Sequence, residues 1–313
     1  MKVLLADIGA TNSRCAVGSG LDDVGEVETF RNTDHAGLAE LLSGFLATLP
    51  PVRRPTWAAL AVAAPVTGDH VQMINIGWAF SRGELQRRLS LDGLHVLNDF
   101  AALAWALPEL APGDLVRVGG GSAVAGGAKV VLGPGTGLGV ASLVSVAGGW
   151  HAIPGEGGHV TLPARDEQEE ALIRLARQRF GHCSAERLVS GPGLSFLHEA
   201  LHGGPAQSAE AIGDLIAAGD PEAAATLEAF FGFLGTVAGD VALTLGALGG
   251  VYVGGGIVPR YRAAFVRSGF RRRFEAKGRY ADYMRAIPTW MIAAQYPTLT
   301  GLLAFARRSV VSA

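Results

Sequence analysis

Cysteine is scarce in this chain. Its 313 residues include only two, Cys15 and Cys183, which give neither a disulfide framework nor the paired CxxC spacing of a zinc site. Charge of one sign is also lacking, because 26 basic and 28 acidic residues leave a formal net charge of −2. This balance creates no global field that would attract nucleic acid or an anionic membrane, so neither is an expected partner.

Long apolar runs are also missing. The longest, from Trp57 to Val66, is too short to cross a bilayer. The chain enters a strand-like segment at once and carries an acidic residue at position 7, which does not resemble a secretory signal. The sequence therefore predicts a cytoplasmic protein.

Several well-known motifs are absent. No GxxxxGK[ST] sequence occurs and none of the glycine turns fits GxGxxG, which argues against a P-loop NTPase and a Rossmann dehydrogenase. No G-x-S-x-G elbow occurs either, so an α/β-hydrolase has no support.

Glycine, in contrast, is abundant, with 44 residues, about twice the usual share. Two strand-like segments run into glycine turns with a threonine at the tip, Gly9-Ala10-Thr11-Asn12 and Gly133-Pro134-Gly135-Thr136-Gly137. Without Cβ atoms, such turns let backbone N–H groups approach an anion, and the threonine hydroxyls add donors. Two turns in two halves of the chain predict a phosphate chain held between two lobes, in a nucleotide clamp without a P-loop.

Strand-like and helix-like segments alternate in two successive blocks. This order predicts an α/β protein with two similar lobes and a ligand at the carboxyl ends of the strands, between the lobes. The proline- and glycine-rich segment 108–121 is the expected domain boundary. Buried strands are expected at 58–64, 94–97 and 251–253, and a hairpin at 130–132 and 140–146.

Capping residues mark several helix starts. The expected helices are 38–49 after Asp34, a short basic helix to Leu89 after the capping box Ser81 and Glu84, 167–180 after Asp166, and 221–248 after Asp220.

Two aspartates stand where apolar strands end. Asp7 is a poor packing choice there unless it is paired, and hydrated Mg²⁺ beside a triphosphate is a plausible partner. Asp99 follows Asn98 at the start of a helix. It is either the N-cap of that helix or a general base for an alcohol that accepts a phosphoryl group, with Asn98 as a hydrogen-bonding neighbour.

The glycine loop 154–160 contains Glu156 and His159. Zinc binding is the weaker interpretation, because no further Cys or His lies at ligand spacing. Hydrogen bonding to the vicinal hydroxyls of a sugar is the better one. Glu186 on its own is typical of a surface helix carboxylate. The turns around Gly191 and at 254–256 are either structural or flat backbone surfaces for adenine and ribose.

The motifs together resemble the bacterial ATP-dependent glucokinases, within the superfamily of sugar kinases, actin and heat-shock chaperone ATPases. The resemblance covers nearly the whole chain in the family's order. It is carried by 7–14, 65–69, 78–81, 98–100, 133–139, 154–160, Ser184-Ala185-Glu186-Arg187, Ser190-Gly191-Pro192-Gly193 and 254–260.

The resemblance implies a duplicated actin-like, ribonuclease H-like fold whose two lobes close over glucose and MgATP. The smaller lobe would comprise 1–108 plus about 302–313, and the larger lobe 109–301. Asp99 would be the base for the sugar 6-hydroxyl, and Asn98, Glu156, His159 and Glu186 would hold the other hydroxyls. The implied product is glucose 6-phosphate, at the entry to glycolysis, and the family implies a homodimer.

The implied nucleotide contacts come from both glycine turns and from the later glycines. Asp7 would act near Mg²⁺, through water. The nucleotide-binding residues would be Asp7, Gly9, Ala10, Thr11, Asn12, Gly135, Thr136, Gly137, Gly191, Gly255 and Gly256.

One departure from the family lies in the first turn, where Ala10 replaces a second glycine. Its methyl group is tolerated if φ is negative. The zinc-binding cysteine cluster of the related repressor and kinase group is absent. The alternatives are a kinase for mannose, fructose or an N-acylated amino sugar, and a non-catalytic sugar or nucleotide sensor on the same fold.

Overall fold

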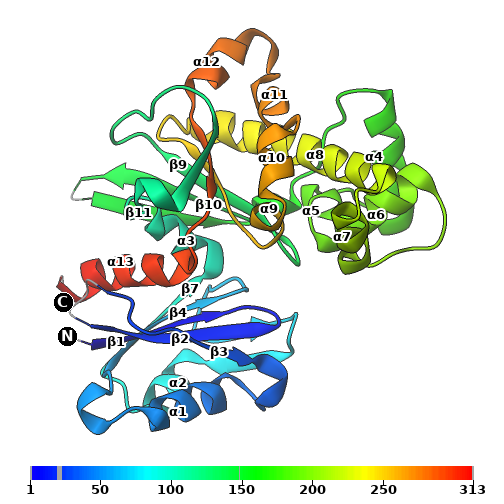
Figure 1. Ribbon diagram of the computed structural model, residues 1–313. Coiled ribbons are helices and arrows are strands. Elements are labelled where there is room, and N and C mark those ends of the chain that lie inside the picture. The colour runs from blue at the N-terminus through cyan, green and yellow to red at the C-terminus, as the bar shows by residue number, and fades with distance from the viewer. Residues whose placement is uncertain (1, 20–22, 148, 312–313) are drawn as a thin grey trace. The chain divides into compact units, whose positions relative to one another are not determined.

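The computed structural model describes residues 2–19, 23–147 and 149–311. The chain divides into two compact units, which are followed by colour along the chain in Figure 1. Unit 1 comprises Met1–Ala111 together with Ala294–Ala313, and unit 2 comprises Pro112–Ala293. Unit 1 is thus built from two separate segments, whereas unit 2 is continuous.

Unit 1 contains a five-stranded sheet in the order β3-β2-β1-β4-β7. Its strands are β1 (Lys2–Ile8), β2 (Asn12–Ser19), β3 (Glu28–Arg31), β4 (Trp57–Val62) and β7 (Gly93–Asn98). β1 and β2 form an antiparallel hairpin, while β1, β4 and β7 are parallel. Ile8 is level with Val62, and Val62 with Asn98. The carboxyl ends of the three parallel strands therefore lie along one edge of the sheet.

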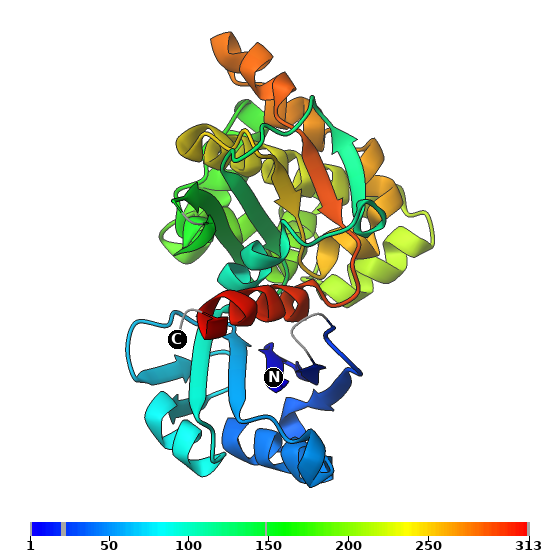
Figure 2. The ribbon, with the colours of Figure 1, turned by 90° about the vertical axis from the view of Figure 1, so that its left-hand side faces the viewer.

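Helices cover both faces of this sheet (Figure 1). Strand residues alternate between the faces: Leu4 and Ile8 belong to the core under α1 (Leu38–Thr48) and α2 (Arg82–Arg88). Leu5 belongs to the core formed with α3 (Asp99–Ala106) and α13 (Pro297–Val311). Figure 2 shows α13, in red, against the strands of unit 1.

The remaining elements of unit 1 are short. They are η1 (Asn32–Asp34), η2 (Pro51–Arg53) and the separate hairpin of β5 (His70–Met73) and β6 (Trp78–Ser81).

Unit 2 contains a six-stranded sheet in the order β11-β10-β9-β12-β13-β8. Its strands are β8 (Leu115–Gly119), β9 (Lys129–Pro134), β10 (Leu138–Val146), β11 (Gly149–Gly155), β12 (Val251–Val253) and β13 (Thr289–Ile292). β9 pairs antiparallel with β10, which confirms the expected hairpin, and parallel with β12. The segment 108–121 is more ordered than expected, since it includes the edge strand β8.

The longest helix of unit 2 is α8 (Pro221–Leu245), drawn in yellow in Figure 1. The others are η3 (Pro112–Asp114), η4 (Gly157–His159), α4 (Glu167–Phe180), α5 (Ala185–Leu188), α6 (Gly191–His202), α7 (Ala209–Ala217), α9 (Ile257–Arg260), α10 (Arg262–Arg267), α11 (Phe270–Glu275), η5 (Gly278–Tyr280) and α12 (Ala281–Ala286). α8 packs against four of these other helices, α5, α6, α7 and α11.

α8 is long and apolar enough to cross a membrane by length and composition alone. Most of its apolar stretch, 72%, is buried inside the protein. Phe230, Phe231 and Phe233 belong to the main core of unit 2. α8 is therefore a core helix of unit 2, which explains its apolar composition.

Most of the expected helix ends are confirmed and two are wrong. The Ser81 hydroxyl accepts a hydrogen bond from the Glu84 N–H at the start of α2, and Asp166 and Asp220 cap α4 and α8. Asp34 does not cap α1, because it lies in η1 and the N-cap position is Gly37. The α8 helix ends before Leu248, because Gly246 adopts the left-handed conformation with φ of 57°, which commonly terminates a helix.

Candidate functional site

The first glycine turn joins β1 to β2 in unit 1. The Gly9 N–H donates to the Asn12 carbonyl at 3.1 Å and closes the turn. Asn32, which follows β3, donates from its backbone N–H to the Thr11 carbonyl at 3.0 Å and from Nδ2 to the Gly9 carbonyl at 2.8 Å. The carbonyls of Gly9, Thr11 and Asn12 are therefore bonded within unit 1.

The N–H groups of the same turn are left as donors. Within the described part of the chain, no hydrogen bond uses the Ala10 or Thr11 N–H as its donor. The Thr11 side chain is exposed, and Asn12 is partly exposed. Unpaired N–H groups on a glycine turn are the donors of an anion-binding nest. Ala10 fits the turn, since Ser90 is the one non-glycine residue with positive φ among those described.

Asp7 lies near the end of β1, one residue before the last of the strand. Its carboxylate forms an ion pair with the Arg14 guanidinium at 3.3 Å, and its side chain is 17% exposed. Burial raises the pKa of the Asp7 carboxyl above its ordinary value, and Arg14 offsets this only in part. A largely buried carboxylate next to an anion-binding turn fits hydrated Mg²⁺, which binds proteins through one or two carboxylates plus phosphate.

Asn98, and not Asp99, is the N-cap of α3. Its Oδ1 accepts from the N–H groups of Phe100 and Ala101 at 3.0 and 3.1 Å. Its Nδ2 donates to Asp99 Oδ1 at 3.0 Å, and the same oxygen accepts from the Phe100 N–H at 2.9 Å. Asp99 is thus held in the first turn of a helix, where backbone N–H groups favour a negative charge.

The first turn and Asp99 lie on the same edge of the unit 1 sheet. The turn follows β1 and Asp99 follows β7, and the register makes Ile8, Val62 and Asn98 level. The two strands are separated by β4, which places their ends roughly 10 Å apart. Unit 1 therefore brings an anion-binding turn and a fixed carboxylate together.

The second glycine turn joins β9 to β10 in unit 2. The Gly135 N–H donates to the Gly137 carbonyl and the Gly191 N–H donates to the Gly135 carbonyl, both at 2.8 Å. Among the described residues, nothing accepts a hydrogen bond from the N–H of Thr136 or Gly137. Thr136 is exposed. This turn repeats the arrangement of the first, since the Gly135 and Gly137 carbonyls are bonded and the Thr136 and Gly137 N–H groups are available.

The glycines at 254–256 lie beside the second turn. A Cβ on Gly133 would be 2.6 Å from the Gly254 carbonyl carbon, and one on Gly255 would be 2.4 Å from the Pro134 carbonyl oxygen. Gly255 also has φ of +79°, which side chains rarely adopt. The contact of two bare backbones explains Gly133 and Gly255, whereas a Cβ on Gly256 would meet no atom within 4 Å. Gly255 and Gly256 remain exposed, as a flat binding surface requires.

Glu186 contacts the second turn directly. Its Oε2 accepts a hydrogen bond from the Leu138 N–H at 2.9 Å. The same oxygen would be only 2.4 Å from a Cβ on Gly137. The surface-carboxylate interpretation of Glu186 is therefore incomplete, because the side chain is only partly exposed and bonded to backbone. Its contact with the turn gave no sequence signal, since the two segments are far apart in the chain.

The loop with Glu156 and His159 packs against Leu138, at the end of the second turn, and against the segment that carries Glu186. A Cβ on Gly158 would be 2.1 Å from the Leu138 carbonyl oxygen, and the Ala185 N–H donates to the Val160 carbonyl at 2.9 Å. The Glu156 and His159 side chains are exposed. Unit 2 thus gathers Glu156, His159 and Glu186 around the second turn. No group of three or more His, Cys, Asp or Glu side chains in the described ranges is placed to hold a metal ion, which gives the zinc alternative no support.

Each unit therefore combines an anion-binding turn at a strand end with carboxylates nearby. Two such turns on two α/β units are the arrangement expected of a protein that binds the phosphate chain of a nucleotide. A family model described as Glucokinase matches residues 4–309, and the chain belongs to this family.

Similar curated proteins include the glucokinase of Aromatoleum aromaticum, which is 48% identical over 95% of this chain and 92% of that protein. The bifunctional protein glk of Paraburkholderia xenovorans is 43% identical over 96% of this chain. This chain spans only 48% of the length of that second relative.

Solved structures show the same fold. A glucokinase from an Antarctic psychrotroph is 35% identical, with a TM-score of 0.89 over 98% of this chain and 99% of that one. A glucokinase of the ROK family from Streptomyces griseus, solved with glucose and AMPPNP, is 19% identical, with a TM-score of 0.64 over 99% of this chain and 100% of that one. The expected two-lobed, actin-like α/β fold is thus confirmed.

Proposed function

We propose that this chain transfers the γ-phosphoryl group of ATP to the 6-hydroxyl of D-glucose, the entry step of glycolysis. The observation that carries the proposal is the placement of Asp99, held by Asn98 at the sheet edge that also bears the first glycine turn. Membership of the glucokinase family and the 48% identity to a glucokinase support it. The same family likeness supports units 1 and 2 as the functional domains, a cytoplasmic location and a homodimer.

In the proposed reaction, Asp99 accepts the proton of the glucose 6-hydroxyl as that oxygen bonds to phosphorus and ADP leaves. The reaction depends mainly on positioning and on neutralising charge. The N–H groups of Ala10, Thr11, Thr136 and Gly137 would hold phosphate oxygens. Mg²⁺, held through water by Asp7, would supply positive charge to the phosphates.

The sugar would be bound by Glu156 and His159 of the glycine loop and by Glu186. Glu156 and His159 are exposed. The carboxylate accepts hydrogen bonds from sugar hydroxyls, and the imidazole nitrogens can donate or accept them. Glu186 uses Oε2 for the Leu138 N–H, which leaves Oε1 for the sugar. Asn98 contributes mainly by holding Asp99, because its Oδ1 caps α3 and its Nδ2 already donates to the Asp99 carboxylate. The nucleoside would lie against Gly191, Gly255 and Gly256.

The direct test is ADP release from MgATP by purified protein, with glucose, mannose, fructose, N-acetylglucosamine or no sugar. Turnover that depends on glucose and greatly exceeds that with the other sugars is expected. Faster turnover with another sugar would replace glucose as the substrate. Binding of glucose with no ADP release in any reaction would indicate a sensor and not a kinase.

The role of Asp99 is tested by Asp99→Asn. Loss of the base should lower kcat by on the order of 10²- to 10⁴-fold, while glucose binding measured by calorimetry changes little. The control is Asp92→Asn. Asp92 is an exposed carboxylate that directly precedes β7, whereas Asp99 directly follows β7, so this variant should keep full activity. Equal loss of glucose binding and turnover in Asp99→Asn would contradict the assignment of a base.

A further inference from the structure

Asn32 is a buried polar residue that the reaction described above does not use. It is 5% exposed, and its neighbour Ser13 is fully buried. The Asn32 side chain donates from Nδ2 to the Gly9 carbonyl at 2.8 Å and accepts at Oδ1 from the Ser13 hydroxyl at 2.7 Å. Its backbone N–H donates to the Thr11 carbonyl at 3.0 Å. One residue thus makes three hydrogen bonds to the segment 9–13.

The orientation of the Asn32 amide is fixed by its partners. The Gly9 carbonyl can only accept, so it requires Nδ2 and excludes Oδ1 from that position. The Ser13 hydroxyl then donates to the oxygen on the other side. Both halves of the amide are satisfied, which is the arrangement that a buried polar group requires.

The bond to Gly9 determines where the Ala10 N–H points. The Gly9 carbonyl and the Ala10 N–H belong to one planar peptide unit and point in opposite directions. When Asn32 draws the carbonyl inward, the N–H is directed away from Asn32, and no described residue accepts a hydrogen bond from it. The same side chain that is buried beneath the turn therefore controls a donor on its outer side.

We propose that Asn32 is a positioning residue for the nucleotide phosphates, because it sets the orientation of the Gly9–Ala10 peptide and so directs the Ala10 N–H toward a phosphate oxygen. This inference rests on the proposed function for the identity of the ligand. It assigns to the segment after β3 a part in nucleotide binding that no motif in that segment indicates.

The principal test is Asn32→Asp, which keeps the shape of the side chain and replaces the donor facing Gly9 with an acceptor. Two acceptors then oppose each other, and the peptide must rotate. The affinity for AMPPNP, measured by calorimetry, should fall on the order of 10- to 100-fold, the loss expected when a hydrogen bond to a charged group is broken. The KM for MgATP should rise, while the affinity for glucose stays the same.

Three further variants separate orientation from charge and from stability. Asn32→Ala removes the donor without adding a negative charge and should weaken AMPPNP binding in the same direction. Ser13→Ala removes only the bond to Oδ1 and should have a smaller effect, which keeps the test available if Asn32→Asp does not fold. Ser81→Ala removes two side-chain hydrogen bonds elsewhere in unit 1 and should leave AMPPNP binding unchanged.

The outcomes distinguish this inference from the proposed function. In one outcome, Asn32→Asp weakens AMPPNP binding but the wild type phosphorylates no sugar. This result would support the positioning role of Asn32 and overturn the proposed kinase activity. Glucose phosphorylation with unchanged AMPPNP affinity in the Asn32 variants would support the kinase and overturn the role of Asn32. Absence of AMPPNP binding by the wild type would overturn both.

Discussion

His95 is a half-buried base in the last parallel strand of unit 1. Its ring stacks on Trp57 at 6.1 Å between centroids and meets Phe305 of α13 edge-on at 5.2 Å. Burial, with a smaller effect from the positive charge of Arg82, lowers the pKa of His95 below 6.5. The folded state therefore disfavours the imidazolium form between two aromatic rings.

The lowered pKa makes stability depend on pH in a defined direction. The neutral His95 side chain contributes its full stabilisation of the folded state above pH 6.5. This contribution is lost as the pH falls from 6.5 toward the pKa of His95 in the folded state, because the unfolded chain binds the proton more readily. His95→Phe keeps the ring contacts and removes the proton site. Urea unfolding of this variant should show a smaller decrease in the free energy of unfolding from pH 7 to pH 5 than the wild type does. An equal decrease in both proteins would contradict this account.

At the residue scale, the sequence indicated groups whose partners are local. The caps Ser81, Asp166 and Asp220 each bond within three residues, and so they were predictable from spacing. Asn32 was not, because its partners lie about twenty residues earlier in the chain. The bond from Leu138 to Glu186 was hidden for the same reason. Buried polar contacts between distant segments leave no periodic pattern.

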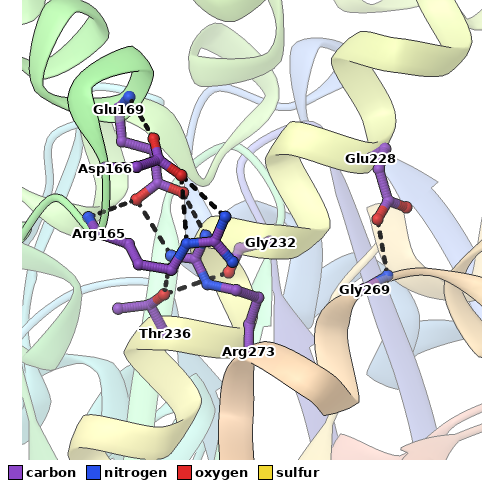
Figure 3. A network of polar contacts seen from close by, with 8 residues as sticks. All are labelled: Arg165, Asp166, Glu169, Glu228, Gly232, Thr236, Gly269 and Arg273. Atoms are coloured by element: carbon purple, nitrogen blue, oxygen red, sulfur yellow. Dashed lines mark hydrogen bonds and ion pairs between the residues drawn. The ribbon is translucent and has the colours of Figure 1, made fainter. Parts of the chain in front are cut away.

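At the scale of elements, a buried ion pair joins three helices of unit 2. Arg273 of α11 is 6% exposed and forms two hydrogen bonds with the Glu169 carboxylate of α4 (Figure 3). Its Nη2 also donates to the Thr236 hydroxyl of α8 at 2.6 Å. The Arg165 N–H donates to Glu169 at 2.8 Å. Both charges are therefore paired and hydrogen-bonded away from water.

Removing one member of this pair should be costly. Glu169→Ala leaves the Arg273 guanidinium buried with a single hydroxyl partner, and it should lower the free energy of unfolding by about 3–5 kcal/mol. Arg285→Ala is the control, because its ion pair with Asp282 is exposed and exposed pairs contribute roughly 0–1 kcal/mol. Similar unfolding midpoints for the two variants in urea would show that burial does not matter here.

Element types were more predictable than element ends. Apolar periodicity was sufficient for α1, the cap Asp220 marked the start of α8, and two apolar segments around a glycine turn indicated the hairpin of β9 and β10. The edge strand β8 was missed because Leu115–Gly119 lies in a proline- and glycine-rich segment, and its strand forms only by pairing with the distant β13. Pairing between distant strands is a property of the fold and not of the local sequence.

For the molecule as a whole, the C-terminal segment that returns to unit 1 approaches α3 closely at a glycine. A Cβ on Gly301 of α13 would be 1.8 Å from the Ala102 carbonyl oxygen of α3, so the two helices touch through bare backbone. Gly44 also lies inside a helix, α1, but a Cβ there has open space within 4 Å. The two positions share the same intrinsic helix preference and differ in their surroundings.

Alanine at these two positions should therefore have opposite effects. Gly44→Ala should stabilise the protein by about 0.5–1 kcal/mol, because alanine favours a helix. Gly301→Ala should destabilise it by about 1–3 kcal/mol or more, because the helices must separate. Thermal and urea unfolding of both variants would test this. A gain in stability for Gly301→Ala would mean that α13 does not contact α3 so closely.

The late position of α13 in the chain has a consequence during translation. Residues 2–111 emerge from the ribosome before α13, yet one face of their sheet, with Val3, Leu5 and Ala59, is buried in part by Leu299 and Leu302. The roughly 180 intervening residues take on the order of 10–40 s to synthesise, at about 5–20 residues per second. Through that interval the nascent sheet presents an uncovered apolar face that chaperones can bind. The sheet of unit 1 therefore completes its core only after α13 has been synthesised.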